Sequence, residues 1–177
     1  SDVAVKLIFA PEVIVKSVPS LSIFSPSSPK VNPRLAPMFT SPFAAGANVM
    51  SPDDAKLIKD AGADAIQVSN HGGRQLDSAT AAINMLPLIR KSVGSEFPLI
   101  FDSGIRSGSD IVRALAFGAD YAMIGRPVMY AMGADGRKGL RRIVEIIKEE
   151  ASTTLGLVGL NDINDITSNI VIDNTVN

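Results

Sequence analysis

The stretch Asp64–Asp77, DAIQVSNHGGRQLD, decides how the chain is interpreted. It begins as a short apolar run, which is typical of a buried strand, and continues into a polar turn rich in glycine. The turn contains His71, the only histidine of the sequence, and Arg74 follows three residues later. An imidazole can exchange a proton near neutral pH, and a guanidinium matches the two oxygens of a carboxylate. A base beside a carboxylate-binding group suits a small acid as substrate.

The sequence around this stretch alternates between strand and helix patterns. Ser51-Pro52-Asp53-Asp54 combines an N-cap, a proline in the first turn and two acids near the positive end of the helix dipole, which predicts a helix over residues 52–61. Strands are predicted at Asp64–Ser69, Pro98–Asp102 and Tyr121–Gly125. Further helices are predicted at Ala79–Val93, Ser109–Phe117 and Asp135–Leu157, with one more helical turn at Asn161–Ile166. The predicted connections are a loop at Asn70–Ser78, a glycine-rich turn at Ser103–Gly108 and a loop that opens with Arg126-Pro127.

This alternation with short connections predicts right-handed βαβ units and a parallel sheet. Candidate polar residues follow each predicted strand: Ser69 and His71, then Asp102 and Arg106, then Gly125 and Arg126. The carboxyl ends of the strands form the active-site face of a (β/α)8 barrel and also hold ligands in a doubly wound open sheet. The pattern therefore predicts an α/β fold and leaves both architectures open.

Residues 1–40 differ from the remainder of the chain. Six prolines fall between Pro11 and Pro37. Proline fixes φ and lacks a backbone donor, so no long helix is expected there. Two apolar runs, Val3–Phe9 and Val13–Val18, are compatible with strands. We interpret residues 1–40 as an irregular Pro/Ser-rich segment and residues 41–177 as the folded part.

Composition limits the class of protein. A chain of 177 residues that is 46% hydrophobic can bury one good core. A net charge of −1 indicates neither nucleic-acid binding nor a polybasic membrane patch. The absence of cysteine excludes disulfides and thiolate metal sites, and no other metal site is predicted. No apolar run reaches the roughly 18 residues that span a bilayer, and the first residues lack a signal-peptide pattern. A cytoplasmic location is expected, with peripheral membrane attachment as the alternative.

Two glycine-arginine segments predict an anion site. In DSGIRSGSD, which starts at Asp102, Gly104 would let a ligand approach the backbone and Arg106 would add a charged contact. Ser107–Ser109 would begin a helix whose free N–H groups face the anion. In IGRP, Ile124–Pro127, the next strand brings a second glycine and a second arginine to the same edge. The alternative is that the glycines serve turns and the arginines are solvated.

Two longer segments carry a family resemblance. VSNHGGRQLD and PLIFDSGIRSGSDIVRALAFGADYAMIGRPVMY resemble the carboxyl-terminal half of the FMN-dependent α-hydroxy-acid oxidases and dehydrogenases, which include lactate and glycolate oxidases and lactate and mandelate dehydrogenases. The resemblance extends from about Val49 to about Ile166. The SNHGGRQLD motif is specific to this family, whereas the phosphate-site pattern is shared with other phosphate-binding barrels. The resemblance implies a TIM-type barrel, of which residues 41–177 would supply about four βα units.

The resemblance also implies residue roles. His71 would take a proton from the 2-hydroxy acid, and Arg74 would bind the substrate carboxylate. The residues expected to contact FMN are Ser69 near the flavin, Asp102 at the ribityl hydroxyls, and Gly104, Arg106, Gly125 and Arg126 at the phosphate. The implied reaction oxidises an L-2-hydroxy acid such as lactate or glycolate to the 2-oxo acid. Oxygen, a quinone or a cytochrome then reoxidises the flavin.

The chain departs from the family in two respects. Members are much longer, and the half without a counterpart here carries the first four strands, substrate-contacting tyrosines and the aspartate that orients the histidine. The family also has a lysine 24 residues before the histidine, where this chain has Ala47. Lys16 lies in a similar motif but 55 residues before His71, so the role is not transferred to it. Activity of this chain is therefore expected to be weak or absent.

Two other functions remain open. The chain could be a non-catalytic partial barrel that binds FMN or phosphate, or that serves assembly only. It could also be another phosphate-binding barrel enzyme, such as a relative of inosine-monophosphate dehydrogenase, which would leave His71 and Arg74 unexplained. Half a barrel leaves strand edges and an apolar face uncovered, so self-association or pairing with a missing half is expected. Val3–Phe9 and Val13–Val18 would cover one edge.

Overall fold

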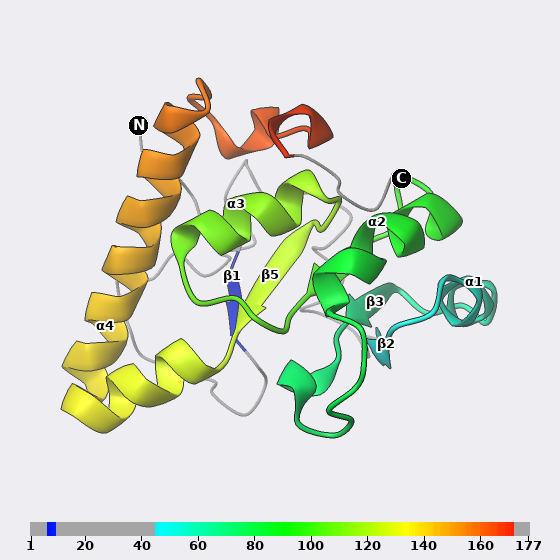
Figure 1. Cartoon of the computed structure of the whole chain (residues 1–177), viewed down its shortest axis with the longest axis horizontal. Coiled ribbons are helices and arrows are strands. Elements are labelled where there is room, and N and C mark those ends of the chain that lie inside the picture. The colour runs from blue at the N-terminus through cyan, green and yellow to red at the C-terminus, as the bar shows by residue number, and fades with distance from the viewer. Residues whose placement is uncertain (1–6, 10–44, 172–177) are drawn as a thin grey trace.

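The computed structural model describes residues 7–9 and 45–171. Its centre is a parallel five-stranded sheet with the order β1-β5-β4-β3-β2 (Figure 1). The strands are β1 (Leu7–Phe9), β2 (Ala45–Val49), β3 (Ala65–Val68), β4 (Leu99–Phe101) and β5 (Tyr121–Ile124). The helices are α1 (Pro52–Asp60), α2 (Ala82–Val93), α3 (Gly108–Ala116) and α4 (Arg126–Leu157), with single 3-10 turns η3 (His71–Gly73), η4 (Ile163–Asp165) and η5 (Ser168–Ile170). The predicted α/β fold with a parallel sheet is confirmed.

The two ends of the sheet are formed by β1 and β2. The strand predicted within Val3–Phe9 is confirmed in its described part, because β1 pairs in parallel with β5 and covers that edge. Strand β2 was not predicted from the pattern, since its sequence AGANV has few large apolar residues. Its pairing with β3 is irregular between Gly46 and Val49. Val13–Val18, and residues 1–40 apart from β1, lie outside the described residues.

Local sequence signals set most helix boundaries. Helix α1 is confirmed together with its cap, because the Asp54 N–H donates to Ser51 Oγ at 3.3 Å. Helix α2 begins at Ala82, three residues after its predicted start, and no side chain caps it. Helix α3 begins at Gly108 with the capping box of Ser107 and Asp110. The remaining predicted turn, at Asn161–Ile166, is present as η4.

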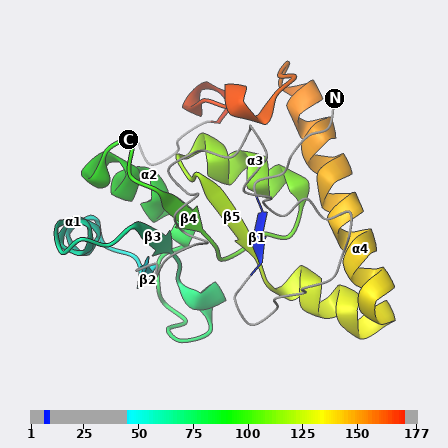
Figure 2. The same ribbon diagram turned by 180° about the vertical axis from the view of Figure 1, so that it is seen from behind.

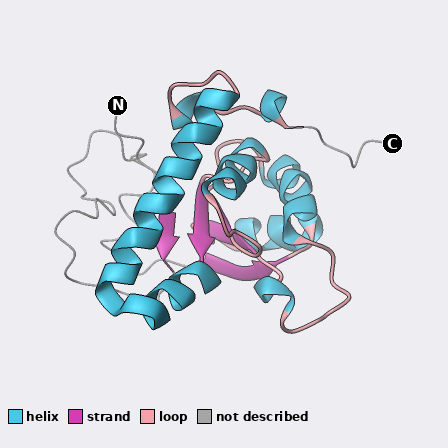
Figure 3. Ribbon diagram, turned by 60° about the vertical axis from the view of Figure 1, so that its left-hand side comes forward, coloured by secondary structure: helices cyan, strands magenta, loops and turns pink. Residues whose placement is uncertain are grey.

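Helix α4 corrects one prediction. Arg126-Pro127 was expected to open a loop, but both residues belong to the first turn of α4. Proline is tolerated there because the first turn of a helix has no intrahelical partner for its N–H groups. A sharp bend at Asp135 and Gly136 separates this first segment from the longer second one (Figure 3). The second segment is the helix predicted at Asp135–Leu157.

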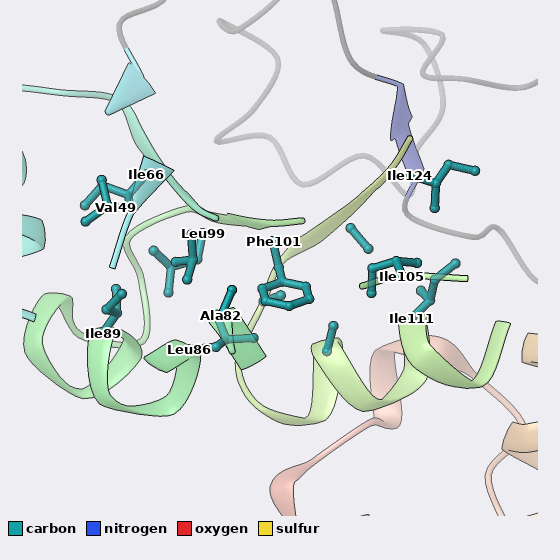
Figure 4. Close-up of a cluster of buried hydrophobic side chains, with 14 of the residues drawn as sticks. Val49, Ile66, Ala82, Leu86, Ile89, Leu99, Phe101, Ile105, Ile111 and Ile124 are labelled. Carbon is teal, nitrogen blue, oxygen red and sulfur yellow. The ribbon is translucent and has the colours of Figure 1, made fainter. Parts of the chain in front are cut away.

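The main core lies between the sheet and the helices. Helices α2 and α3 cover one face of the sheet (Figure 1), and from the opposite side the strands are seen in front of them (Figure 2). Figure 4 shows the side chains of this layer, which include Ile66, Leu99 and Phe101 from the strands and Leu86, Ile89 and Ile111 from the helices. Each fully buried side chain of this size contributes about 1.5–3 kcal/mol. Among the helices of the described residues, none has the length and apolar composition needed to cross a membrane.

Helix α4 packs closely on the start of α3. A Cβ atom on Gly108 would lie 2.2 Å from the backbone nitrogen of Ala151 and 2.4 Å from the carbonyl oxygen of Ile147. Only glycine permits this approach. The approach brings the side chain of Glu150 to the first turn of α3, where its Oε2 accepts the Gly108 N–H at 2.8 Å.

Candidate functional site

The candidate residues follow three neighbouring strands at the same edge of the sheet. Strands β3, β4 and β5 are adjacent and parallel, with Val68 opposite Phe101 and Phe101 opposite Ala122. Their carboxyl ends therefore meet at one edge. The residues that follow them are Ser69 and His71 after β3, Asp102, Gly104 and Arg106 after β4, and Gly125 and Arg126 after β5. These residues lie at one edge of the sheet, as the pattern led us to expect, while the existence of a site there and the roles of its residues remain predictions.

The segment after β3 forms a tight turn around His71. Asn70 caps this turn, because its Oδ1 accepts the Gly73 N–H at 3.1 Å. His71, Gly72 and Gly73 have φ values of 55°, 66° and 73°, so three consecutive residues adopt the left-handed region. Glycine adopts this region readily, whereas a histidine there is uncommon. The two glycines explain how the chain turns, and His71 requires support from its neighbours.

That support comes from two serines. Ser69 is 1% exposed, and its Oγ accepts the His71 N–H at 3.0 Å. Ser103 Oγ accepts the N–H groups of Asn70 at 3.2 Å and of Gly72 at 3.1 Å. Ser103 itself has a φ of 83°. Ser103 was not among the predicted site residues, and its place between Asp102 and a turn glycine is the only signal for it in the sequence.

Asp102 is held at the end of β4 by two side chains. Gln67 Nε2 donates to Asp102 Oδ2 at 3.2 Å, and Ser103 Oγ donates to Asp102 Oδ1 at 3.1 Å. Asp102 is half-buried. Each carboxylate oxygen can accept further hydrogen bonds, so the group is oriented and still able to bind hydroxyls. Gln67 was also missed, since the alternation within β3 does not show what a half-buried glutamine contacts.

The N-terminus of α3 corrects part of the predicted anion site. Its N–H groups were expected to be free, but Gly108 donates to Glu150 and Asp110 donates to Ser107 Oγ at 3.3 Å. The Asp110 carboxylate accepts the N–H groups of Arg106 and Ser107, both at 3.0 Å. Two acids therefore occupy the positive end of this helix. An anion cannot use these N–H groups without displacing them.

The N-terminus of α4 has no such cap. Its N-cap residue is Gly125, and no side chain caps this end. A Cβ atom on Gly125 or on Gly104 would meet no atom of the described residues within 4 Å, so within that part of the chain open space adjoins both glycines. An uncapped helix N-terminus beside open space is suited to a phosphate. Of the two segments predicted to bind an anion, the one at Gly125 and Arg126 therefore keeps a helix N-terminus that no side chain caps, and its role in binding phosphate stays a prediction.

Arg126 joins this end of α4 to the His71 turn. Its guanidinium is half-buried, and Nη2 donates to the carbonyl oxygen of Gly72 at 3.4 Å, which is a long hydrogen bond. His71, Arg74 and Arg106 are exposed, and their side chains make no hydrogen bond or ion pair with the described residues. Their charged or polar ends are therefore available to a ligand.

Two cavities lie on either side of the turn, and Asn70 lines both. The cavity of about 320 Å³ is lined by Gly72, Ser103, Gly104 and Arg126 among others. The cavity of about 480 Å³ is lined by Ser69 and His71, together with apolar side chains such as Met50 and Met85. The structure thus brings Gly104 and Arg126 together, and Ser69 and His71 together. Arg74, Asp102, Arg106 and Gly125 line neither cavity. In the described part of the chain, no group of three acidic or histidine side chains is placed to bind a metal.

Comparison with known proteins shows the family of the chain. A model of the family described as FMN-dependent dehydrogenase matches residues 48–173. The chain belongs to this family. The predicted family resemblance is therefore confirmed, and FMN is the cofactor on which the family depends. Ala47, where the family pattern led us to expect lysine, directly precedes the matched region.

Individual relatives agree with the family match. The chain is 43% identical over 125 residues to a 2-hydroxyacid oxidase of Dictyostelium discoideum, covering 71% of this chain and 32% of the relative. It is 45% identical over 125 residues to an L-lactate dehydrogenase of Actinobacillus pleuropneumoniae, covering 71% and 33%. A mandelate oxidase variant with a monooxide FMN adduct superposes with a TM-score of 0.67 at 39% identity, covering 74% of this chain and 42% of that protein. The chain spans about a third of the length of the curated relatives it matches.

Proposed function

We propose that the chain binds FMN at the carboxyl edge of its sheet and contributes the base for oxidation of a 2-hydroxy acid. The observation that carries this proposal is the uncapped N-terminus of α4 at Gly125, which adjoins open space and whose next residue, Arg126, contacts the His71 segment. Arg126 connects the two parts by its contact with Gly72. The phosphate-binding end and the proton-accepting end are therefore neighbours.

The residues present fit the cofactor. Gly104, Arg106, Gly125 and Arg126 would hold the FMN phosphate, because they combine exposed backbone, a helix N-terminus and two guanidinium groups. Asp102 would accept hydrogen bonds from the ribityl hydroxyls with the lone pairs that Gln67 and Ser103 leave available. Ser69 would lie beside the flavin ring. When bound, FMN supplies the two-electron acceptor of the reaction.

The chain's own residues would carry the proton chemistry. His71 would take a proton from the substrate, and its exposed ring is available for this. Arg74 would bind the substrate carboxylate with its exposed guanidinium. The Arg74 N–H lies 3.4 Å from the carbonyl oxygen of His71, so the two residues belong to one turn of chain. The substrate would be an L-2-hydroxy acid such as lactate or glycolate.

We further propose that the parallel sheet is an arc of a TIM-type barrel, with residues 41–177 supplying about four βα units. Strands β2 to β5 follow one another in space in the order of the sequence, as barrel strands do. The pairing of β1 with β5 continues that arc by one strand. Among the described strands β2 pairs with β3 alone, so its other edge would suit self-association or pairing with the remainder of a barrel.

Flavin binding without efficient turnover is a second candidate function, and Ala47 favours it. A lysine at this position would place a positive charge near the reduced flavin, whereas alanine carries none. Within the described residues, the imidazole of His71 also has no carboxylate partner to fix its tautomer. We expect flavin reduction by lactate to be slow or absent for this chain.

Titration with FMN tests the proposal. FMN fluorescence should be quenched on binding, and Arg126→Met should weaken the affinity by about tenfold to a hundredfold through loss of a charge-assisted contact. Arg137→Met is the matched control, because Arg137 is an exposed arginine beyond the bend of α4. Equal FMN affinity for the two variants would contradict the phosphate site.

Reduction of the bound flavin in the absence of oxygen tests whether His71 acts as the base. Any reduction of the bound flavin by lactate should be slow, and it should be lost in His71→Ala while FMN affinity is retained. Bleaching that survives in His71→Ala would exclude this residue as the base. Binding without bleaching in the unaltered chain would favour the second candidate.

A further inference from the structure

Ser103 is unusual because one hydroxyl group contacts four neighbours at the edge of the sheet. Its Oγ donates to Asp102 Oδ1 at 3.1 Å and accepts the N–H groups of Asn70 at 3.2 Å and Gly72 at 3.1 Å. The fourth neighbour is Ser69 Oγ, at 3.3 Å. Ser103 also has a φ of 83°, in the left-handed region that side chains other than glycine, asparagine and aspartate seldom adopt. A strained backbone therefore places this hydroxyl at the centre of a network.

The Asp102 carboxylate determines which way the hydroxyl of Ser103 donates. A carboxylate oxygen only accepts, so the proton of Ser103 is directed at Asp102. The two lone pairs of Ser103 Oγ then accept the Asn70 and Gly72 N–H groups, which leaves its 3.3 Å contact with Ser69 Oγ as a weak, shared interaction. Ser69 Oγ separately accepts the His71 N–H at 3.0 Å. The two N–H groups on either side of His71 are thus connected through one hydroxyl to a carboxylate, and each bond polarises the next.

We infer that Ser103 is a positioning residue for the catalytic turn, an inference that rests on the proposed role of His71 as base. The N–H groups immediately before and after His71, those of Asn70 and Gly72, both end on its oxygen. The N–H of His71 itself ends on Ser69 Oγ, which lies 3.3 Å from Ser103 Oγ. Two backbone donors that flank His71 thus depend on one side chain. Ser103 fixes the left-handed turn and with it the place of the imidazole.

Ser103 also couples this turn to the proposed cofactor site. Its bond to Asp102 is one of two that orient the carboxylate, and Gln67 Nε2 supplies the other at 3.2 Å. The group proposed for the ribityl hydroxyls and the turn that carries the base therefore share a hydroxyl. A ligand that draws on the Asp102 carboxylate changes the bonds of the His71 turn through Ser103.

Two substitutions separate the hydroxyl from the backbone strain. Ser103→Ala removes the hydroxyl and keeps the cost of a side chain at positive φ, whereas Ser103→Gly removes both. If the hydroxyl holds the turn, the two variants should loosen it equally. If the backbone conformation holds it, the glycine variant should resemble the unaltered chain. Ser95→Ala is the control, because Ser95 is an exposed serine whose hydroxyl donates to Glu96.

Amide hydrogen exchange measured by NMR on the full chain without flavin provides the decisive readout. The amides of Asn70 and Gly72 should exchange about fivefold to tenfold faster in both variants, which corresponds to the loss of one hydrogen bond each. Amides of α3 should be unchanged, and a urea titration of each variant shows whether global unfolding contributes. Unchanged exchange at Asn70 and Gly72, or acceleration in Ser103→Ala alone, would overturn the inference.

The rate of flavin reduction then tests whether Ser103 positions His71. With FMN and lactate, both variants should lower the rate of flavin reduction by about tenfold to a hundredfold, as expected for a displaced base, while FMN affinity falls by a smaller factor because Gln67 still orients Asp102. Failure of the unaltered chain to reduce flavin would favour flavin binding without turnover and would overturn the role of His71 as base, whereas the amide result would stand. Loosened amides with an unchanged reduction rate would show that Ser103 is structural only and would overturn its positioning role.

Discussion

Replacing Arg90 by methionine should destabilise the protein and leave FMN binding unchanged, because Arg90 ties together the end of the sheet opposite the candidate site. Its guanidinium donates to the carbonyl oxygens of Gly118 at 2.8 Å, Gly94 at 2.8 Å and Phe97 at 2.7 Å. It also forms an ion pair with Asp120 Oδ2 at 2.6 Å. One side chain of α2 thus holds the segments that lead into β4 and β5.

The structure sets the size of the effect. The side chains of Arg90 and Asp120 are 16% and 32% exposed. Removing one partner costs about 3–5 kcal/mol for a fully buried pair, and an exposed pair contributes about 0–1 kcal/mol. In Arg90→Met the Asp120 carboxylate keeps the Leu99 N–H at 2.8 Å, so the charge is not left alone. We therefore expect a loss of about 2–3 kcal/mol in the free energy of unfolding, between those limits.

Urea denaturation followed by circular dichroism measures this loss. With an m-value of roughly 2 kcal/mol/M, the midpoint should fall by about 1 M or more. Arg142→Met is the matched control, because Arg142 and Glu145 form an ion pair with both side chains more than 60% exposed, at 62% and 61%. Its midpoint should move little.

Two results would refute the reasoning. The first is an Arg90→Met midpoint no lower than that of Arg142→Met. The second is full stability in Arg90→Lys, because a lysine ammonium has three donors and cannot reproduce the planar fork that reaches four acceptors. An unfolding free energy that falls together with FMN affinity would show that the two ends of the sheet are not independent.

Two further predictions concern pH and packing. Burial, with the nearby Asp120 carboxylate as the smaller cause, raises the pKa of Tyr121 from 10.0 to about 12; since the fold favours the neutral phenol, stability should fall by roughly 2–3 kcal/mol as pH rises from about 10 to 12. Tyr121→Phe should lack this component in urea titrations across that range, and an equal decline in both proteins would contradict it. Gly108→Ala should lower the midpoint strongly, because the added Cβ would lie 2.2 Å from the backbone of Ala151. Gly156→Ala, where a Cβ meets nothing within 4 Å, should leave stability unchanged or slightly raised, and equal effects of the two substitutions would argue against the tight α3–α4 contact.

The sequence was sufficient for features that depend on neighbouring residues. The capped start of α1 at Ser51 depends on residues three apart, and it is found as predicted. The strands β3, β4 and β5 are short continuous apolar runs, and their alternation with helices places Ser69, Asp102 and Gly125 at one edge. Both inferences use periodicity and local chemistry, which a single sequence contains.

Features that depend on distant residues could not be predicted. Glu150 reaches the N-terminus of α3 from 42 residues away, so the sequence of that helix start contains the capping box of Ser107 and Asp110 but no sign of this second acid. Ser103 contacts Asn70 and Gly72 across 33 and 31 residues. The uncapped start of α4 at Arg126 could not be predicted for a different reason. Arg126-Pro127 is compatible both with a loop and with the first turn of a helix.

Backbone strain in the described residues is concentrated at the edge of the sheet that carries the candidate site. Among the described residues, the positions other than glycine with positive φ are Asn48, His71 and Ser103. They lie at or just beyond the carboxyl ends of the neighbouring strands β2, β3 and β4. Residues held in sparsely populated conformations persist only where their surroundings stabilise them, and they concentrate at functional sites. Here the strain lies at the edge that carries the proposed site, while the four-acceptor contact of Arg90 stabilises the opposite end. Relieving the strain, as in Ser103→Gly, should therefore raise stability relative to Ser103→Ala while both variants lose the ordered His71 turn.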